Sequence, residues 1–297
     1  MRKQKYFKAR KKKVLFHECD LTDAGRVKSV IEKIKPELVF HLAAELPYAN
    51  LSGDFVSAFK DNVAATSNLL ESLRKNCPKS KILIAGSSRE YGAVLPEECP
   101  VKEDRVLKPD SPYAMSKAEQ FLIGSRYARD FGMNIYYARI FYLTGPGQPD
   151  GFVCSSLVRQ AVLLKKKMIS KIAVGNLRLK RDFLDVRDAV SALFLITEKG
   201  RSGETYNICS GKAYSVEEIF RIILKLAGLE GAEFGIEPGL VRDSEPPVIF
   251  GDNSKIVSET NWRPVFPIEK ALGDLLKEYE ENAETLVDST RTEEAGK

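Results

Sequence analysis

Short apolar runs alternate with amphipathic stretches through the first half of the chain. The apolar runs predict strands, at 14–16, 37–42, 81–85 and 134–139. The amphipathic stretches predict helices, at 23–34, 55–74 and 112–131. Ser111 followed by Pro112 is a typical helix start, because serine caps the first turn and proline needs no N–H donor there. The order of these elements indicates a parallel sheet with helices on both faces.

The pattern changes after Gly145-Pro146-Gly147. Helical spacing returns at 152–167, 186–198, 216–227 and 268–284, and short apolar runs at 172–174 and 205–208 predict strands. Prolines at 238, 246, 247, 264 and 267 mark the loops between these elements. The polar end of the chain, 285–297, is expected to be disordered.

Composition narrows the class of protein only a little. The net charge of +5 comes largely from the first thirteen residues, which hold eight of the Lys and Arg residues. Such an arm suits a nucleic acid or an acidic membrane, but a solvated terminus is favoured, so neither is expected as a partner. The five cysteines are scattered and odd in number, which favours a reducing cytoplasm. Neither histidine has metal-ligand spacing, and no signal-peptide pattern occurs.

Tyr113 and Lys117 form a Y-x-x-x-K pattern on the helix predicted at 112–131. Residues four apart share one face of a helix, so the phenol and the ammonium should project together. A neighbouring ammonium favours the phenolate, so the pattern predicts a lowered pKa for Tyr113 and proton exchange near neutral pH. By itself the pattern is equally well explained by a pair on the helix surface.

Ser87 supplies the context. The strand predicted at 81–85 runs into Gly86-Ser87-Ser88-Arg89-Glu90-Tyr91-Gly92, and ligands of open α/β sheets lie beyond the carboxyl ends of strands. This serine, with S-P-Y-x-x-x-K on the next helix, resembles the catalytic core of the extended short-chain dehydrogenase/reductase family. The resemblance implies a Rossmann-type doubly wound sheet, NAD or NADP, and a homodimer. It assigns Ser87 to orienting the substrate oxygen, Tyr113 to acid/base catalysis, and Lys117 to holding the nicotinamide ribose as well.

Three further segments resemble the cofactor site of that family. Asp20-Leu21 resembles the stretch that contacts adenine. Leu42-Ala43-Ala44 resembles the end of the strand beside the cofactor, where small side chains permit close approach. Asn62 matches an asparagine of the next helix. Each segment alone is explained by ordinary packing, but the ordered set is specific.

The second half resembles the branch that holds GDP-mannose 4,6-dehydratase and GDP-4-keto-6-deoxy-mannose reductase. The motifs are Val174-Gly175-Asn176-Leu177, Arg181-Asp182-Phe183-Leu184-Asp185, Tyr206-Asn207-Ile208, Arg242-Asp243-Ser244-Glu245-Pro246 and Asn261-Trp262-Arg263-Pro264. They imply that Arg181 and Arg242 bind the diphosphate or the guanosine ribose, which suits the bidentate contacts of a guanidinium, and that Glu245 contacts the same ribose. A structural ion pair is the other explanation for each arginine. Ser88, Arg89 and Asn176 are also expected on the substrate side.

Position 89 separates two reactions of this branch. A dehydratase needs an additional acid/base, which the family supplies as a glutamate three residues before the glycine of the Y-G turn. Here that position is Arg89, and the adjacent Glu90 would point to the opposite face of an extended segment. The sequence therefore predicts NAD(P)-dependent reduction of the C4 keto group of a nucleotide-linked 4-keto-6-deoxy sugar. Dehydration and 4-epimerisation remain alternatives, since epimerases use the same Ser-Tyr-Lys set.

The chain departs from the family at two places. No G-x-x-G-x-x-G occurs near the N-terminus, so the glycine-rich turn that binds pyrophosphate and its two flanking strands are expected to be absent, leaving an apolar sheet edge exposed. The choice between NAD and NADP is then not readable. Tyr142 stands where relatives have an asparagine that touches the substrate. A non-catalytic remnant that binds a nucleotide sugar is the alternative from another class.

The resemblance also divides the chain. Residues 1–150, joined by 185–210, are predicted as a dinucleotide-binding domain without its N-terminal βαβ unit. Residues 151–184 and 211–267 are predicted as a smaller α/β substrate-binding lobe, followed by the C-terminal helix at 268–284.

Overall fold

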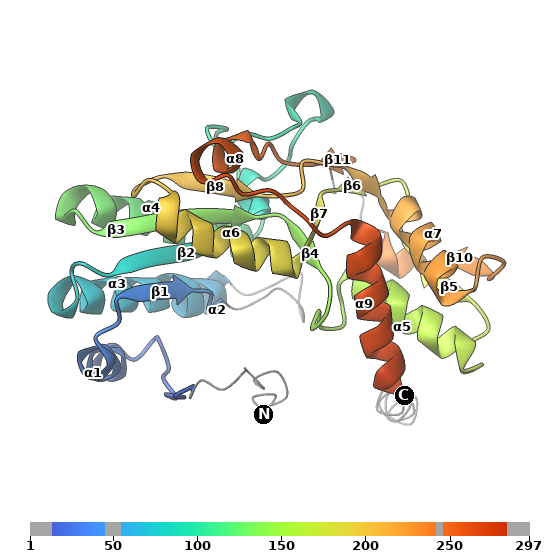
Figure 1. Ribbon diagram of the computed structural model, residues 1–297, viewed down its shortest axis with the longest axis horizontal. Helices are drawn as coiled ribbons and strands as arrows, with labels where there is room; N and C mark the ends of the chain where they lie inside the picture. The colour runs from blue at the N-terminus through green and yellow to red at the C-terminus, as the bar shows by residue number, and fades with distance from the viewer. Residues whose placement is uncertain (1–13, 45–54, 242–245, 284–297) are drawn as a thin grey trace.

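The computed structural model describes residues 14–44, 55–241 and 246–283 (Figure 1). The first half contains α1 (Ala24–Ile34), β1 (Leu38–His41), α2 (Phe55–Ala58), the π-helical turn η1 (Phe59–Ala64), α3 (Ala65–Asn76), β2 (Lys81–Ser87), the 3-10 helices η2 (Ser88–Tyr91) and η3 (Pro96–Glu98), α4 (Pro112–Phe131) and β3 (Asn134–Ile140). The second half contains β4 (Tyr142–Thr144), α5 (Val153–Lys165), β5 (Ile172–Val174), β6 (Lys180–Arg181), β7 (Phe183–Asp185), α6 (Val186–Lys199), β8 (Thr205–Ile208), β9 (Tyr214–Ser215), α7 (Val216–Ala227), β10 (Phe234–Ile236), the 3-10 helix η4 (Pro238–Leu240), β11 (Val248–Ile249), α8 (Ser254–Thr260) and α9 (Ile268–Glu281).

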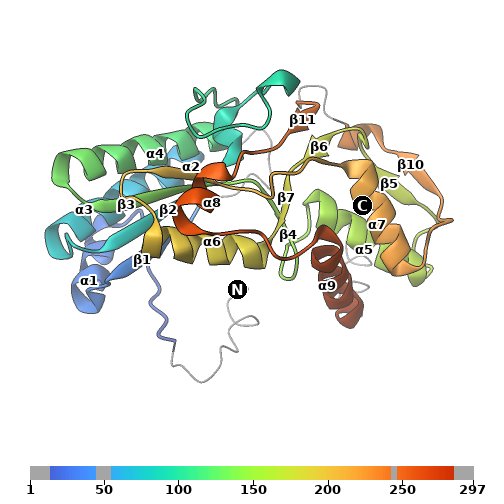
Figure 2. The same cartoon turned by 45° about the horizontal axis from the view of Figure 1, so that its top comes forward.

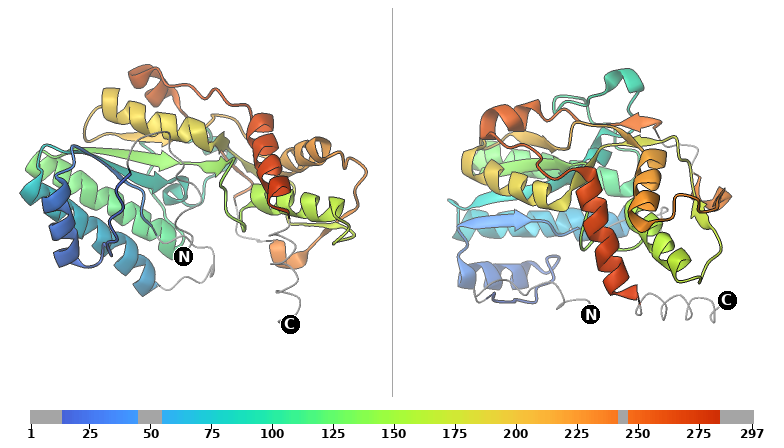
Figure 3. Two further views of the ribbon diagram at one scale, coloured as in Figure 1. Left: turned by 60° about the horizontal axis from the view of Figure 1, so that its bottom comes forward. Right: turned by 45° about the vertical axis from the view of Figure 1, so that its right-hand side comes forward.

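Four parallel strands form the main sheet, in the order β1-β2-β3-β8. Helices α1, α3 and α4 lie on one face, and α6 with α8 lies on the other (Figures 1 and 3). The predicted α/β fold with a parallel sheet between two helical layers is confirmed.

Side chains of the two central strands alternate between two hydrophobic cores. Ile82 and Ile84 of β2 pack into the core beneath α1, α3 and α4, whereas Leu83 packs into the core beneath α6. Ile135 and Tyr136 of β3 repeat this alternation. Because both faces are covered, these strands are apolar at successive positions, which is the pattern expected of a buried parallel sheet.

Helix α4 begins and ends where the sequence predicts. The Ser111 hydroxyl accepts a hydrogen bond from the Ala114 N–H at 3.3 Å, and Pro112 occupies the first helical position. Gly132 closes the helix with a φ of 62°, a left-handed conformation that glycine adopts without steric cost. The helix therefore holds its residues in a fixed register against the sheet.

One predicted strand is wrong. Residues 14–16 form no strand, and Leu15 and Phe16 are each 68% exposed. Within the described ranges β1 is the edge of the main sheet and pairs only with β2, so the run has no neighbouring strand to complete its backbone hydrogen bonds. The same edge is apolar, as predicted: Phe40 of β1 packs against Phe194 of α6 with 4.9 Å between ring centres, and Phe194 remains half exposed.

Helices α5, α7 and α9 surround a third core beside the end of the main sheet (Figure 2). Leu272 and Leu275 of α9 are fully buried there, together with Ile219 of α7. The short pair β4-β7 contacts both α6 and α9, and the pair β10-β5 and the set β11-β6-β9 form two more small sheets. Sequence analysis missed most of these strands because they are only two or three residues long. The boundaries of the two predicted domains stay a prediction.

Asp182, between β6 and β7, binds two loops that are distant from it and from each other in sequence. Its carboxylate accepts hydrogen bonds from the Ser210 N–H at 2.7 Å, the Ser210 hydroxyl at 2.6 Å, the Gly211 N–H at 3.0 Å and the Gly251 N–H at 3.2 Å. Burial raises the pKa of this carboxyl to about 6, and the four hydrogen bonds oppose that rise. One side chain thus ties the end of β8 and the segment after β11 to the end of β6.

Asp182→Asn is expected to lower the free energy of unfolding by about 2–3 kcal/mol, because the amide N–H₂ would face backbone donors that stay buried. Urea unfolding at pH 7.5 measures the difference. Asp104→Asn, at an exposed position, is the control and should change stability by less than about 0.5 kcal/mol. Equal unfolding midpoints for the two variants would contradict the proposed clamp.

Candidate active site

Strand β2 and helix α4 bring the three predicted catalytic residues together. Ser87 ends β2, and Tyr113 and Lys117 lie on consecutive turns of α4, which packs against β2. Ser87 lies close enough to the Tyr113 phenol to oppose the rise of its pKa. The Lys117 ammonium donates to the Ala85 carbonyl at 2.8 Å and lies 6.0 Å from the centre of the Tyr113 ring. The surface-pair explanation of Y-x-x-x-K is therefore wrong, since Lys117 is only 3% exposed.

Two glycines make room for the side chains around the end of β2. A Cβ at Gly124 of α4 would lie 2.7 Å from the Ile84 side chain of β2. A Cβ at Gly86 would lie 2.5 Å from a Glu90 carboxylate oxygen and would also overlap the Tyr137 ring. Contacts this short do not occur in proteins, so a larger residue at position 86 would displace Glu90 or Tyr137, and one at position 124 would displace the Ile84 side chain.

The predicted lowering of the Tyr113 pKa is wrong for this structure. Burial raises the pKa of Tyr113 to about 12, although the nearby Ser87 side chain opposes the rise. Burial also lowers the pKa of Lys117 to about 8. The ammonium does not act on the phenol as predicted because it points at the Ala85 carbonyl. The phenol is accordingly protonated at neutral pH and suited to donating a proton.

Asn62 belongs to a buried polar network behind α4. It lies in the π-helical turn η1, a type of irregularity that is frequent at functional sites. Its side-chain amide donates to the Ser116 hydroxyl at 2.8 Å, which in turn donates to the Tyr113 carbonyl at 2.9 Å. The Asn62 backbone carbonyl accepts a hydrogen bond from the Thr66 hydroxyl at 2.7 Å, and that hydroxyl lies 2.8 Å from the His41 Nε2 atom. The network fixes the first turn of α4 to the helix that follows β1.

The other predicted cofactor residues lie near the edge strand. Leu42 and Ala43 follow the carboxyl end of β1 and are exposed, and Ala44 is half-buried. Asp20 forms a turn in which its carboxylate accepts from the Thr22 N–H at 2.9 Å. The Asn68 side chain holds that turn against α3 by donating to the carbonyls of Leu21 and Thr22 at 3.0 Å each.

The predicted substrate residues are distributed over both parts of the molecule. Ser88 is buried in η2, and the partly exposed Arg89 pairs with Asp110 at 3.5 Å. Asn176 accepts a hydrogen bond from the Arg178 N–H at 3.0 Å. Arg181 is 4% exposed and donates to the Pro246 carbonyl at 2.8 Å. Arg242 and Glu245 lie outside the described residues.

The comparison of positions 89 and 90 assumed that the segment after Ser87 is extended, and this assumption is wrong. The segment forms the 3-10 helix η2, in which Glu90 closes a capping box with Ser87. Glu90 is nevertheless directed inward: it is fully buried and pairs with Arg139 of β3 at 3.0 Å. The charged position in an otherwise apolar strand was the only sequence signal for this pair.

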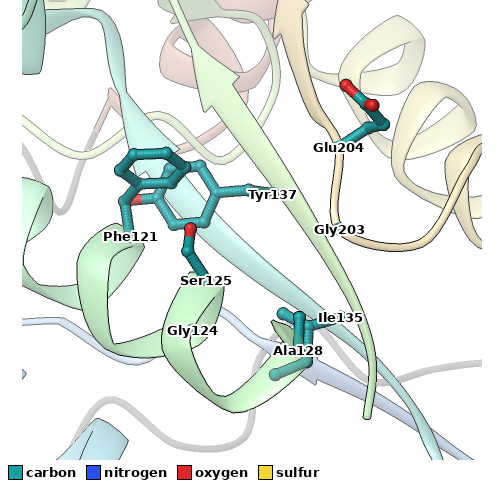
Figure 4. Close-up of a pocket in the computed structure, with 8 residues that line it drawn as sticks. All are labelled: Phe121, Gly124, Ser125, Ala128, Ile135, Tyr137, Gly203 and Glu204. Carbon is teal, nitrogen blue, oxygen red and sulfur yellow. The ribbon is translucent and has the colours of Figure 1, made fainter. Parts of the chain in front are cut away.

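Tyr142 occupies β4 beside Arg181. Its ring centre lies 5.7 Å from the Arg181 guanidinium carbon and 6.0 Å from the Phe183 ring centre. A small pocket elsewhere, between α4, β3 and the loop before β8, contains none of the catalytic candidates; Figure 4 shows its lining, which includes Phe121 and Tyr137. Among residues 14–44, 55–241 and 246–283 there is no cluster of His, Cys, Asp or Glu that could hold a metal ion. The same ranges contain no helix long and apolar enough to cross a membrane.

A Rossmann-type sheet with a serine at a strand end and a Tyr-x-x-x-Lys pair on the next helix defines an extended short-chain dehydrogenase/reductase. The chain belongs to the GDP-mannose 4,6 dehydratase family, whose sequence pattern matches residues 2–275. The class and the branch predicted from sequence are confirmed.

Individual relatives agree with this assignment. The chain is 29% identical to the GDP-6-deoxy-D-mannose reductase of Pseudomonas aeruginosa over 265 residues, which cover 89% of this chain and 86% of that one. It is 32% identical to the GDP-6-deoxy-D-talose 4-dehydrogenase of Aggregatibacter actinomycetemcomitans over 240 residues, 80% of this chain and 78% of the relative. The solved structure of RMD from Pseudomonas aeruginosa complexed with NADPH superposes with a TM-score of 0.84 at 28% identity, covering 90% and 88% of the two chains.

His41 is expected to stay neutral at pH 7, since burial and then the Lys117 charge lower its pKa to about 4. The folded state therefore binds this proton more weakly than an unfolded histidine with a pKa of about 6.5, and stability should fall by up to about 3 kcal/mol as the pH drops from 6.5 to 4. NMR of the imidazole signals tests this, because the chain has only two histidines and His17→Gln leaves one. A titration of His41 with a midpoint near 6.5 would contradict the buried network.

Proposed function

We propose that this chain reduces the C4 keto group of a nucleotide-linked 4-keto-6-deoxy sugar, of the GDP-4-keto-6-deoxy-mannose type, with NADPH or NADH. The observation that carries the proposal is that the partly buried Ser87 and Tyr113 and the buried Lys117 meet at the carboxyl end of β2. The names of the two relatives, a reductase and a 4-dehydrogenase of GDP-deoxy sugars, support chemistry at C4.

The residues of the chain fit the nicotinamide end of such a cofactor. The Lys117 ammonium has three protons and donates one of them to the Ala85 carbonyl, which leaves donors for ribose hydroxyls. Leu42 and Ala43 are exposed beside β1, and Ala44 next to them adds little bulk. We propose these residues with Asn62, and Asp20-Leu21 at the adenine end, as the cofactor contacts. When bound, the reduced nicotinamide supplies the hydride.

The side chains then divide the work on the substrate carbonyl. The Tyr113 hydroxyl, protonated at neutral pH, gives its proton to the C4 oxygen. The Ser87 hydroxyl donates a hydrogen bond to the same oxygen and stabilises the developing negative charge. Lys117, whose ammonium is bound to the Ala85 carbonyl, is proposed to hold the nicotinamide ribose and not to act on the phenol directly.

Recognition of the nucleotide is proposed for the side that faces β6 and β11. Arg181 is bound to the carbonyl of Pro246, the residue directly after Glu245, which supports a common role for Arg181, Arg242 and Glu245 at the diphosphate and ribose. Ser88 and Arg89 in η2, with Asn176 after β5, are proposed to contact the sugar side.

Reduction is favoured over dehydration by the surroundings of Glu90. A dehydratase must remove a proton from C5, which requires a carboxylate with access to the sugar. The Glu90 carboxylate is fully buried against Arg139, Tyr137 and the Ser87 backbone, and position 89 is an arginine. We also propose a cytoplasmic homodimer, supported by the resemblance and by the five cysteines, none of them in a disulfide.

Purified chain is expected to oxidise NADPH or NADH when given GDP-4-keto-6-deoxy-mannose, and Tyr113→Phe should lower kcat by about 10²- to 10⁴-fold because the proton donor is lost. Absorbance at 340 nm measures the rate, and the sugar product is identified by mass. Tyr127→Phe, on the same helix but with its hydroxyl directed to Glu71, is the matched control and should keep the wild-type rate.

Two results would contradict the proposal. Formation of the 4-keto-6-deoxy product from GDP-mannose itself would make the chain a dehydratase. A folded chain that shows no saturable fluorescence change with either NADPH or NADH would favour the non-catalytic nucleotide-sugar-binding protein. The same titration gives the preference between the two cofactors.

A further inference from the structure

A buried pair of opposite charges lies directly beneath the catalytic residues. The Glu90 carboxylate and the Arg139 guanidinium are 3.0 Å apart, and their side chains are 0% and 2% exposed. The rings of Tyr91, Phe121 and Tyr137 surround the guanidinium, with centres 5.0, 4.8 and 5.9 Å from its central carbon. Figure 4 shows Phe121 and Tyr137 side by side at this position. Both charges are therefore withdrawn from water.

Stability does not account for this pair. Burying two charges costs much of what their attraction returns, and apolar residues of similar shape often serve a fold as well. The neighbouring strands and helices obtain their stability from large apolar cores. Apolar residues could fill this position without the desolvation free energy that Glu90 and Arg139 require. The presence of the pair therefore points to a role in the neighbouring catalytic site.

Glu90 is connected to the catalytic residues by hydrogen bonds. One carboxylate oxygen accepts the Ser87 backbone N–H at 2.6 Å and lies 3.2 Å from the Tyr137 hydroxyl. That hydroxyl shares its one proton between this oxygen and the Lys117 carbonyl, which accepts at 2.8 Å. Gly86 is required for this arrangement, because a Cβ there would meet both Glu90 and Tyr137. One carboxylate therefore sits between the strand that ends at Ser87 and the helix turn that carries Lys117.

We propose that Glu90 is a positioning residue for the reduction. Its carboxylate holds Ser87 through the Ser87 backbone N–H and Lys117 through the Tyr137 hydroxyl, and it places a fixed negative charge near both residues. Burial raises the pKa of Glu90, and the Arg139 guanidinium 3.0 Å away opposes that rise and holds the carboxylate in place as an ion pair. The proposal rests on the proposed function for its effect on kcat, but its effect on Lys117 can be measured without any substrate.

The charge of Glu90 acts in the direction that the proposal needs. It raises the pKa of Lys117, against the larger lowering by burial, and it adds to the raised pKa of Tyr113. Removing it should let Lys117 lose its proton at a lower pH. The other titratable or charged groups that face this cluster are Arg139 and Tyr137 from β3, Arg89 and Tyr91 from η2, and His41 from β1.

The test replaces the pair by two amides, Glu90→Gln with Arg139→Gln, so that neither charge is left buried alone. The Lys117 ammonium is followed by NMR of lysine labelled with ¹³C at Cε, with Lys117→Met to assign its signal. We expect the pKa of Lys117 to fall by about 1. At pH 7 kcat should fall about 10- to 100-fold, while KM for the sugar nucleotide should stay within about twofold of the wild-type value. The basic limb of the pH–rate profile should move to lower pH. A merely structural pair would move neither the titration nor this limb.

Two further variants make the result decisive. Tyr137→Phe deletes one hydroxyl and keeps the ring, and it should lower kcat without changing KM because Lys117 loses its link to Glu90. Glu103→Gln is the matched control: this acid also accepts a backbone N–H, that of Asn207 at 2.9 Å, but it has no hydrogen bond with Ser87, Tyr113 or Lys117, and wild-type kinetics are expected.

The outcomes separate this proposal from the proposed function. Wild-type chain that reduces no nucleotide sugar refutes the function, and the Lys117 titration then decides the role of Glu90 by itself. A folded amide variant with the wild-type Lys117 titration and kcat overturns the proposal. If that variant does not fold, wild-type kcat in Tyr137→Phe overturns it, whereas a lowered kcat at unchanged KM supports it.

Discussion

The contact between helix α4 and strand β2 sets the geometry of the whole site. A lysine of the helix reaches a carbonyl of the strand, from Lys117 to Ala85 at 2.8 Å, and Gly124 of the helix leaves room for the Ile84 side chain of the strand. Side chains packed on both faces of β2 fix the position of the strand relative to the helix. Every catalytic candidate is placed relative to this contact, so the two hydrophobic cores are also what aligns the chemistry.

Burial explains the electrostatic character of the site. It makes each group resist its charged form: the pKa of His41 falls to about 4, that of Lys117 falls to about 8 and that of Tyr113 rises to about 12. Without polar partners to oppose burial, all three side chains would therefore be uncharged. Fixed polar partners, chiefly the Ala85 carbonyl and the Glu90 carboxylate, keep the ammonium that the proposed reaction needs.

The sequence predicted the main elements and the positions of the catalytic candidates because their signals are local. Ser111-Pro112 marks the start of α4, and the fixed interval between Tyr113 and Lys117 places both on one face. The strand at 14–16 was wrong because a strand exists only beside a partner, which an apolar run cannot reveal. The pKa of Tyr113 was predicted in the wrong direction because spacing along a helix does not show where an ammonium points. The pair of Glu90 and Arg139 is 49 residues apart in sequence and depends on the parallel alignment of β2 and β3.

The four hydrogen bonds at Asp182 also have a consequence for motion. Loops usually exchange their amide hydrogens quickly, because each can open by itself. Ser210, Gly211 and Gly251 share one acceptor, so none of them opens without loosening the others. The loop of Ser210 and Gly211 and the loop of Gly251 should behave as one cooperative unit with slow amide exchange. Any opening of the molecule between its main sheet and the region of α7 and α9 would then occur around this unit, as a hinge, and not through it.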